Sequence, residues 1–183
     1  MIIGLSGYAR SGKNTVADML GEEYRQVSFA EPMREALYKL NPILGKDSLT
    51  GGLIQLKNMV DAVGWDMAKE LSTEVRRLLQ VLGTEVGREM FGENFWVNIA
   101  MTGIDSGDNV VFTDVRFPNE AWAISRIGGQ VWRVNREGVE AVNTHPSEHA
   151  LDGWDFDRVI NNNGTLNDLR RQINELQVQI MEK

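Results

Sequence analysis

Cysteine is absent from the 183 residues of this sequence. Its absence excludes disulfide bonds, thiolate catalysis and cysteine-based metal sites. The sequence also lacks any apolar run that approaches the ~18 residues of a membrane span, and no charged leader with a cleavage site precedes the first apolar segment. We therefore expect a soluble, cytoplasmic protein with no membrane partner.

An excess of basic residues is lacking as well. Lysine and arginine together number 19, against 26 for aspartate and glutamate, which gives a net charge of −7. Because nonspecific binding to a nucleic-acid backbone requires a basic surface, this balance argues against a nucleic-acid partner. The hydrophobic fraction of 42% and the chain length are typical of one globular domain. We find no internal repeat and no low-complexity linker.

What the sequence does contain, near its start, is the spacing of a phosphate-binding P-loop. Residues 7–14 read GYARSGKN and match the pattern G-x-x-x-x-G-K-[ST] at every position but the last. The apolar run Met1–Ser6 predicts a strand before the loop, and apolar residues at helical spacing predict a helix over Asn14–Tyr24. In this context the helix N-terminus faces an anion, and Lys13 reaches the terminal phosphates. A glycine turn into a surface helix is the alternative interpretation.

Strand-like and helix-like segments alternate along the chain. Strands are expected at Met1–Ser6, Gln26–Ala30, Val97–Met101, Val110–Val115, Gln130–Val134 and Arg158–Ile160. Helices are expected at Asn14–Tyr24, Met33–Leu40, Leu71–Val86 and Pro118–Ile127, and after a capping box formed by Thr165 and Asp168. Residues Asn41–Trp65 are expected to form loops and a short helix. The alternation predicts an α/β fold with a mainly parallel sheet, whose ligands bind beyond the carboxyl ends of the strands.

A second group of candidate residues follows the apolar segment at 110–112. Asp114 is placed where P-loop proteins keep the carboxylate that organises magnesium or its waters, and Arg116 could meet a phosphate. The alternative is that Asp114 caps the following turn. Phosphoryl transfer requires several arginines to converge on anionic substrates, although a typical arginine is a solvated surface residue. The candidates are Arg10, Arg34, Arg76, Arg88, Arg116 and Arg136.

Residues 145–149, HPSEH, match the H-x-x-E-H pattern of an inverted zinc protease. That pattern requires a continuous helix with both histidines on one face and a third ligand from further along the chain. Pro146 fits only the first turn of a helix, and the surrounding sequence is loop-like. We therefore expect a flexible loop over the phosphates here, in preference to a zinc site.

Several longer stretches resemble the phage-type deoxynucleoside monophosphate kinases and, more distantly, dephospho-coenzyme A kinase. They are LSGYARSGKNTVADML, FAEPMREAL, VRRLLQVLGTEVGREMFGENFWV, FTDVRFPNEA, THPSEHALD and INNNGTLNDL, and they cover most of the chain except about 41–64. The resemblance implies a three-layer P-loop NTPase fold of the nucleoside monophosphate kinase type. It further implies a single kinase domain over residues 1–183, with an acceptor-binding helical region at about 31–100, a lid at about 135–152 and, for a phage protein, the host cytoplasm as location.

The resemblance also implies a set of site residues. Those expected to bind ATP are Gly7, Ala9, Arg10, Ser11, Gly12, Lys13, Asn14, Thr15, Asn161, Gly164 and Thr165. Those expected to bind the deoxynucleotide are Arg34, Arg76, Gln80, Arg88, Trp96, Arg116 and Glu148. The residues expected to act on the transferred phosphoryl group are Lys13, Arg10, Asp114 and Arg136. Because Asn14 replaces the Asp or Ser/Thr that the family commonly has there, Mg²⁺ would be held by Asn14 and Asp114 largely through water.

We therefore expect an enzyme that transfers the γ-phosphoryl group of ATP, with Mg²⁺, to a deoxynucleoside 5′-monophosphate. Its partners would be these small-molecule substrates, and a homodimer is an open possibility. One alternative is a kinase acting on dephospho-coenzyme A or another small alcohol, for which Asp114 would accept a proton. Another is a nucleotide-binding switch or regulatory ATPase. Against a GTPase switch, the sequence has no Asn-Lys-x-Asp signature, and its one D-x-x-G match, Asp61–Gly64, follows no convincing strand.

Overall fold

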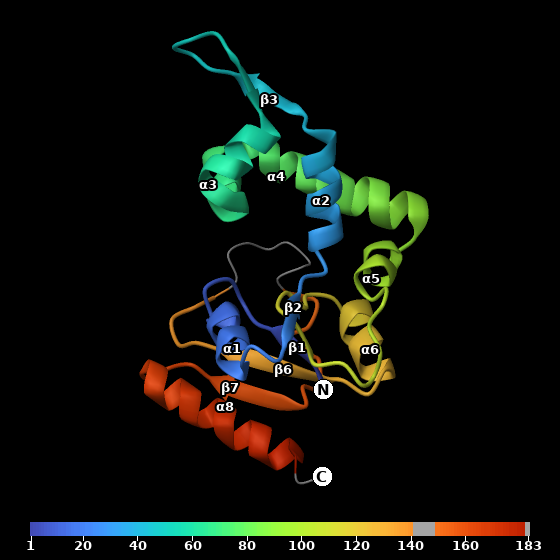
Figure 1. The fold of residues 1–183 in the computed structure, drawn as a ribbon, viewed down its shortest axis with the longest axis vertical. Coiled ribbons are helices and arrows are strands. Elements are labelled where there is room, and N and C mark those ends of the chain that lie inside the picture. The colour runs from blue at the N-terminus through green and yellow to red at the C-terminus, as the bar shows by residue number, and fades with distance from the viewer. Residues whose placement is uncertain (141–148, 182–183) are drawn as a thin grey trace. The chain divides into compact units, whose positions relative to one another are not determined.

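A computed structural model describes residues 1–140 and 149–181 of the chain. The chain forms two compact units, which can be followed by residue number in Figure 1: the first comprises Met1–Phe29 and Ala100–Lys183, and the second comprises Ala30–Ile99. The second unit covers nearly the same residues as the helical region expected at about 31–100. Within the described part of the chain, no helix is long and apolar enough to cross a lipid bilayer.

The first unit is built on a five-stranded parallel sheet. Its strands are β1 (Ile2–Ser6), β2 (Arg25–Val27), β5 (Val110–Phe112), β6 (Gln130–Asn135) and β7 (Arg158–Asn161). Their order across the sheet is β2-β5-β1-β6-β7, and every neighbouring pair is parallel. The central strand β1 is buried along its whole length, as expected for a sheet covered on both faces. The expected parallel α/β sheet is confirmed, and the carboxyl ends of its strands share one edge.

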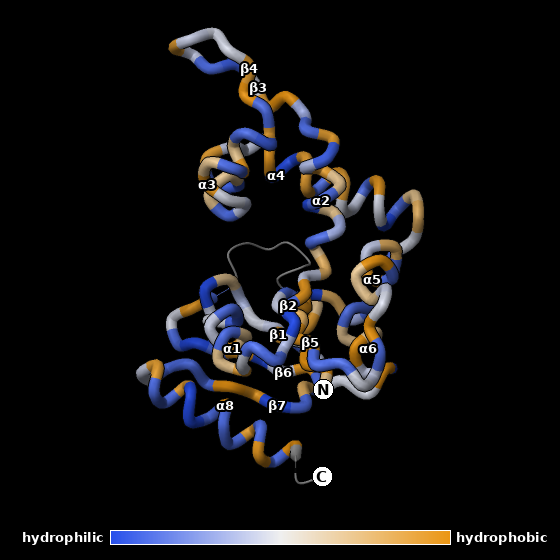
Figure 2. Tube along the Cα trace, viewed as in Figure 1, coloured by the Kyte–Doolittle hydropathy of each residue, from blue (hydrophilic) through white to orange (hydrophobic). Residues whose placement is uncertain are grey.

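Helices cover both faces of this sheet. They are α1 (Lys13–Leu20), α6 (Pro118–Arg126) and α8 (Leu166–Met181). Ile3 and Leu5 of β1 belong to one apolar cluster with α1 and α8. Gly4 faces the other side of the sheet, because side chains alternate along a strand, and it lies against Ile124 of α6. Figure 1 shows this arrangement of three layers, and Figure 2 shows the alternation of apolar and polar residues along α8.

The second unit consists of helices and one hairpin. Its elements are α2 (Glu31–Leu40), β3 (Ile43–Lys46), β4 (Leu53–Gln55), α3 (Leu56–Leu71), α4 (Thr73–Gln80), η1 (Val81–Met90) and α5 (Phe95–Ala100), whose last residue belongs to the first unit. The strands β3 and β4 pair in antiparallel fashion, and η1 is a π-helix that continues α4. The core of this unit is formed by buried residues of α2, α3 and α4, namely Leu37, Leu56, Ala68 and Val75.

The strand expected at Val97–Met101 is wrong, because this segment lies in α5 and the turn after it. The backbone N–H of Asn98 donates to the oxygen of Asn94 (2.8 Å), which is the i to i−4 hydrogen bond of a helix. Two exposed residues separate the buried Val97 from the buried Ala100. This spacing of three places both on one face of a helix, whereas a strand would alternate.

The segment Asn41–Trp65, expected to be loops and a short helix, instead forms the β3–β4 hairpin and much of α3. The Asp47 carboxylate accepts hydrogen bonds from the backbone N–H groups of Leu49 (2.9 Å) and Thr50 (2.8 Å) and so closes the hairpin turn. The pairing of β3 with β4 contains a register irregularity, and α3 is interrupted by a non-helical backbone at Gly64. Both irregularities hide the periodicities by which these elements could have been predicted.

Other helix limits differ by a turn or less from those expected. The first helix ends at Leu20, a turn before the expected end at Tyr24. The helix expected at Leu71–Val86 begins after Ser72, whose hydroxyl accepts a hydrogen bond from the N–H of Val75 (3.4 Å), and runs on into η1. The first and last residues of these helices are therefore set by capping and by π-helical hydrogen bonds, which the spacing of hydrophobic residues does not reveal.

The capping box expected before α8 is confirmed. The Asp168 Oδ2 atom accepts a hydrogen bond from the backbone N–H of Thr165 (3.0 Å), and the Thr165 hydroxyl accepts one from the backbone N–H of Asp168 (3.3 Å). These reciprocal contacts satisfy N–H groups that have no partner inside the helix. The helix expected at Pro118–Ile127 is also confirmed, as α6.

Candidate active site

The loop between β1 and α1 requires glycine at two positions. Gly7 has a φ of +147° and Gly12 a φ of +103°, conformations that other residues rarely adopt. A Cβ atom at Gly7 would meet the backbone oxygen of Val134, and one at Gly12 would meet the side-chain amide of Asn162. The loop is therefore packed against the carboxyl ends of β6 and β7. Both positions therefore require glycine for two reasons: the positive φ of the backbone, and the lack of room for a Cβ atom.

Lys13, the first residue of α1, lies folded over this loop. Its Nζ donates hydrogen bonds to the backbone oxygens of Gly7 (2.7 Å) and Tyr8 (2.9 Å), and the oxygen of Tyr8 also accepts from the N–H of Ser11 (3.2 Å). With the N-terminal amides of α1, the ammonium group makes a cradle in which an anion can bind. The other predicted loop residues are exposed or partly exposed: Ala9, Arg10, Asn14 and Thr15.

The turn after β7 is tied to the loop by a residue whose role the sequence did not indicate. The Nδ2 of Asn162 donates to the backbone oxygen of Ser11 (2.9 Å). The predicted residues Asn161, Gly164 and Thr165 lie at the end of β7 and at the cap of α8. The only local signal for Asn162 is its place among three consecutive asparagines, which does not distinguish it from its neighbours.

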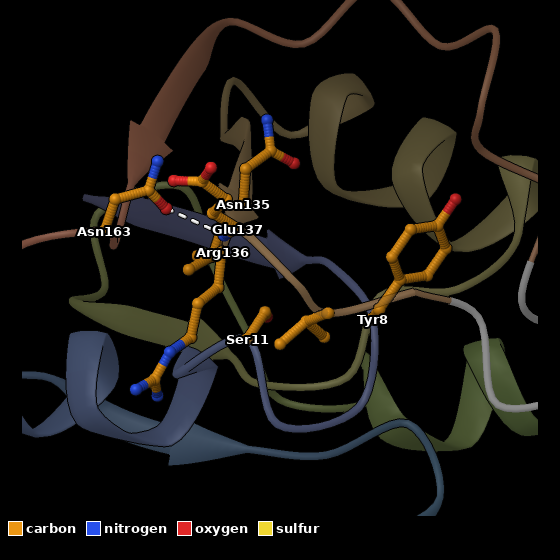
Figure 3. A pocket seen from close by; sticks show the side chains of 8 residues that line it. Tyr8, Ser11, Asn135, Arg136, Glu137 and Asn163 are labelled. Atoms are coloured by element: carbon orange, nitrogen blue, oxygen red, sulfur yellow. Dashed lines mark hydrogen bonds between the residues drawn. The ribbon is translucent and has the colours of Figure 1, made fainter.

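A cavity of about 310 Å³ opens beside the loop (Figure 3). Among the described residues, the hydroxyl of Ser11 has no hydrogen-bond partner, although the residue is only 1% exposed. Such a buried polar atom normally bonds to water or to a ligand. The Asn163 side chain accepts a hydrogen bond from the N–H of Glu137 (2.8 Å) and closes one side. The lining residues are Tyr8, Ser11, Val134, Asn135, Arg136, Glu137, Val139 and Asn163, so the predicted Arg136 borders this cavity.

Asp114 joins the carboxyl ends of β5 and β2. Its Oδ2 accepts a hydrogen bond from the Ser28 hydroxyl (2.6 Å), and its Oδ1 accepts one from the N–H of Phe29 (2.8 Å). Both strands end earlier than the sequence predicts, β2 at Val27 and β5 at Phe112, and the contacts of Asp114 lie just beyond these ends. A carboxylate offers about four acceptor positions. These two hydrogen bonds are therefore compatible with a further role of Asp114 towards water or a cation.

Glu120, which the sequence analysis did not select, orders the turn that carries Arg116. Its Oε2 accepts hydrogen bonds from the backbone N–H groups of Arg116 (2.7 Å) and Phe117 (3.1 Å), and the residue is only 5% exposed. A charged acceptor with two backbone donors holds such a turn firmly. A signal was present, because a glutamate two residues after the proline that opens a helix is typical of N-terminal capping.

In the second unit, cationic side chains gather around Asp66. Its Oδ1 lies 2.7 Å from the Lys69 Nζ, and this hydrogen bond, with the charges of Lys69 and Arg34, lowers the pKa of the Asp66 carboxyl. The Nε of Arg76 donates to the backbone oxygen of Lys69 (2.7 Å). Arg34 and Arg76 were both predicted to bind the acceptor. Lys69 was not, because no motif marks its position.

Trp96 is 9% exposed and supports the π-helix η1. Its indole N–H donates to the backbone oxygen of Gly83 (3.0 Å), and a Cβ atom at Gly87 would meet the same ring. The predicted acceptor residues Gln80 and Arg88 lie at the end of α4 and within η1. The indole of Trp96 is therefore placed to shape the helix that carries Arg88.

Glu148, predicted to bind the acceptor, lies outside the described residues, as does most of the HPSEH motif and much of the lid expected at 135–152. His149 is described, and its Nδ1 lies 2.9 Å from Oδ2 of Asp152. Within residues 1–140 and 149–181, no three histidine, aspartate or glutamate side chains gather as a metal site.

Comparison with known proteins assigns the family. Residues 54–173 match the model of the family described as deoxynucleotide monophosphate kinase. A protein of Acanthamoeba polyphaga mimivirus is 30% identical to this chain, and the alignment covers 94% of each. The deoxynucleotide monophosphate kinase of Enterobacteria phage T4 is 28% identical, and the alignment covers 94% of this chain and 96% of that protein. The dephospho-CoA kinase from Campylobacter jejuni superposes over 98% of this chain and 96% of its own, at 10% identity and with a TM-score of 0.45. The family model and the two viral relatives show that the chain belongs to the deoxynucleotide monophosphate kinase family.

Proposed function

We propose that this protein transfers the γ-phosphoryl group of ATP to the 5′-phosphate of a deoxynucleoside monophosphate, giving ADP and a deoxynucleoside diphosphate. The observation that carries the proposal is the loop between β1 and α1, where the Lys13 ammonium group lies against the backbone oxygens of Gly7 and Tyr8 at the start of α1, so that both could bind a phosphate. The acceptor class comes from the family, since the phage T4 relative is named a deoxynucleotide monophosphate kinase. A parallel sheet with this cradle at its carboxyl edge supports the same interpretation.

The first unit would bind the phosphoryl donor. Phosphoryl transfer requires mainly positioning and charge neutralisation. Lys13 and the loop amides would hold the terminal phosphates, and Arg10 and Arg136 would neutralise the charge that develops. The cavity of about 310 Å³ beside the loop lies within the ~300–1,000 Å³ range of small-molecule sites and would take the nucleoside of ATP. The Ser11 hydroxyl in its lining offers a buried polar contact.

The second unit would bind the acceptor. The phosphate of the monophosphate would be held by Arg34, Arg76 and Arg88. Gln80 would also contact the acceptor, because it ends the helix α4 that continues into η1, where Arg88 lies. An arginine provides paired donors that match the oxygens of a phosphate. No general base is required, because the acceptor phosphate is already an anion. In the first unit, Arg116 would meet a substrate phosphate, and Glu120 orders the turn that carries it.

The residues of this chain would suit a Mg²⁺ ion whose ligands are mostly substrate phosphates and water. The chain offers a neutral amide at Asn14, which is exposed, and a carboxylate at Asp114, whose two oxygens already accept hydrogen bonds. Mg²⁺ commonly keeps several waters and takes only one or two carboxylates besides substrate phosphates. When bound, the ion would neutralise charge on the donor phosphates. Asp114 and Asn14 would orient its waters.

The proposal is tested by measuring ADP formation from ATP and Mg²⁺ with each of the four natural deoxynucleoside monophosphates, with dephospho-coenzyme A, and with no acceptor. We expect ADP to form only when a deoxynucleoside monophosphate is added. Formation without any acceptor would instead identify an ATPase. If ADP formed only when dephospho-coenzyme A was added, the protein would instead be a kinase that acts on dephospho-coenzyme A.

A further inference from the structure

The position of Lys13 depends on the peptide group of Tyr8. The Tyr8 oxygen accepts hydrogen bonds from the Lys13 Nζ (2.9 Å) and from the N–H of Ser11 (3.2 Å), so it joins the lysine to the backbone of the loop. A shift of this peptide would displace the ammonium group from the cradle. Whatever holds the Tyr8 side chain therefore also influences Lys13.

Asp152 holds the Tyr8 side chain from a distant part of the sequence. The Tyr8 hydroxyl donates to Oδ1 of Asp152 (3.2 Å), while Oδ2 of Asp152 lies 2.9 Å from the His149 Nδ1. The N–H of Asp152 also donates to the backbone oxygen of His149 (3.0 Å), which closes a turn between the two residues. The contact with His149, then the hydrogen bond from Tyr8 and the charge of Arg133, lower the pKa of Asp152 and keep it ionised.

Arg133 supplies a rigid support for this contact. It lies on β6, paired in register with Ser6 of β1, and its side chain is only 12% exposed. Its guanidinium carbon lies 4.7 Å from the centre of the Tyr8 ring and 5.6 Å from that of Phe156, and one guanidinium nitrogen lies 3.7 Å from Asp152. A partly desolvated cation over an aromatic face is attracted to it. Tyr8 is thus held between a fixed arginine and a carboxylate.

We propose that Asp152 is a positioning residue for the phosphate loop, which holds the Tyr8 side chain against Arg133 and, through the Tyr8 peptide, sets the position of Lys13. This inference rests on the proposed function, in which Lys13 binds the donor phosphates. Asp152 is not a catalytic residue in this account, because it acts on the substrate only through Tyr8 and Lys13. Its role is to keep the loop arranged for the donor before ATP arrives.

The test compares Asp152→Ala, Tyr8→Phe and the double variant with the wild type. Asp155→Ala is the matched control, since Asp155 is exposed and lies in the same segment. Calorimetric titration with ATP in the absence of acceptor gives the donor affinity, and steady-state kinetics give KM for each substrate and kcat. We expect Asp152→Ala to lower kcat/KM for ATP about tenfold and Tyr8→Phe to lower it a few fold, with the KM for the monophosphate unchanged.

The double variant should be no worse than Asp152→Ala alone, because both substitutions remove the same link. A general loss of folded protein would lower kcat without changing the affinity for ATP, so the titration separates positioning from stability. The inference is overturned if Asp152→Ala matches Asp155→Ala in ATP affinity, or if the two single losses multiply in the double variant. If the wild type binds ATP but transfers nothing to a monophosphate, the proposed function fails, while the affinities still decide the role of Asp152.

Discussion

At the scale of single residues, carboxylates order the backbone of the candidate site. Asp114 accepts hydrogen bonds from Ser28 and Phe29, and Glu120 accepts them from Arg116 and Phe117. In each case the acceptor is charged and the donors include backbone N–H groups, which makes the contacts stronger than those between neutral groups. The turns that present Asp114 and Arg116 are therefore fixed before any substrate binds.

Glu120→Ala should lower the free energy of unfolding by about 2 kcal/mol or more, because it leaves two partly buried N–H groups without their acceptor. Urea denaturation followed by circular dichroism measures this loss. Glu175→Ala, at an exposed position of α8, is the control and should change little. Equal stability of Glu120→Ala and wild type would show that the carboxylate does not hold the turn.

Some residues of the candidate site could be identified from the sequence alone, and others could not. The phosphate loop could be located because Gly7, Gly12 and Lys13 are close in sequence and their spacing follows from the shape of one loop. Asn162, in contrast, contacts Ser11 across 151 positions of the chain. Contacts of this kind arise from tertiary structure, which no local pattern in a single sequence records.

At the scale of elements, the capping box of α8 gives a prediction about pH. Hydrogen bonds from the hydroxyl and then the N–H of Thr165 lower the pKa of Asp168, with a further contribution from the charge of Arg171. The ionised form therefore stabilises the folded protein above the ordinary aspartate pKa of about 3.9, and this contribution is lost as the pH falls through the lowered value.

Wild type should accordingly be more stable than Asp168→Ala at neutral pH, and the difference should shrink as the pH falls below the ordinary pKa of an aspartate. Urea midpoints measured across this range test the expectation. A difference that stays constant with pH would mean that the charge of Asp168 plays no part in capping the helix.

Strands and helices of the first unit could largely be predicted, because buried parallel strands are continuous apolar runs and the helices have one apolar face. The second unit was harder. Val97–Met101 is too short for its period to distinguish a helix from a strand. In the β3–β4 hairpin the irregular pairing breaks the alternation that would have marked both strands. The failures therefore fall where hydrogen bonding, rather than hydrophobic spacing, decides the element.

At the scale of the whole molecule, the two units have separate roles in the proposed function, and kinetics can separate them. Arg76→Ala or Arg88→Ala should raise the KM for the monophosphate about tenfold, because they would bind its ground-state phosphate, whereas Arg136→Ala should mainly lower kcat. Arg77→Ala is the control, since Arg77 is exposed and paired with Glu74 at 2.7 Å. If Arg76→Ala and Arg88→Ala behave like Arg77→Ala, the acceptor assignment is wrong.

The most direct test of phosphoryl transfer follows the label from ATP labelled in its γ-phosphate, with wild type and Lys13→Ala side by side. We expect the label in the deoxynucleoside diphosphate, and a transfer rate reduced about a hundredfold or more in Lys13→Ala, whose folding is checked by circular dichroism. The account would be contradicted by label that appears only as inorganic phosphate, or by a folded Lys13→Ala variant that transfers it at the wild-type rate.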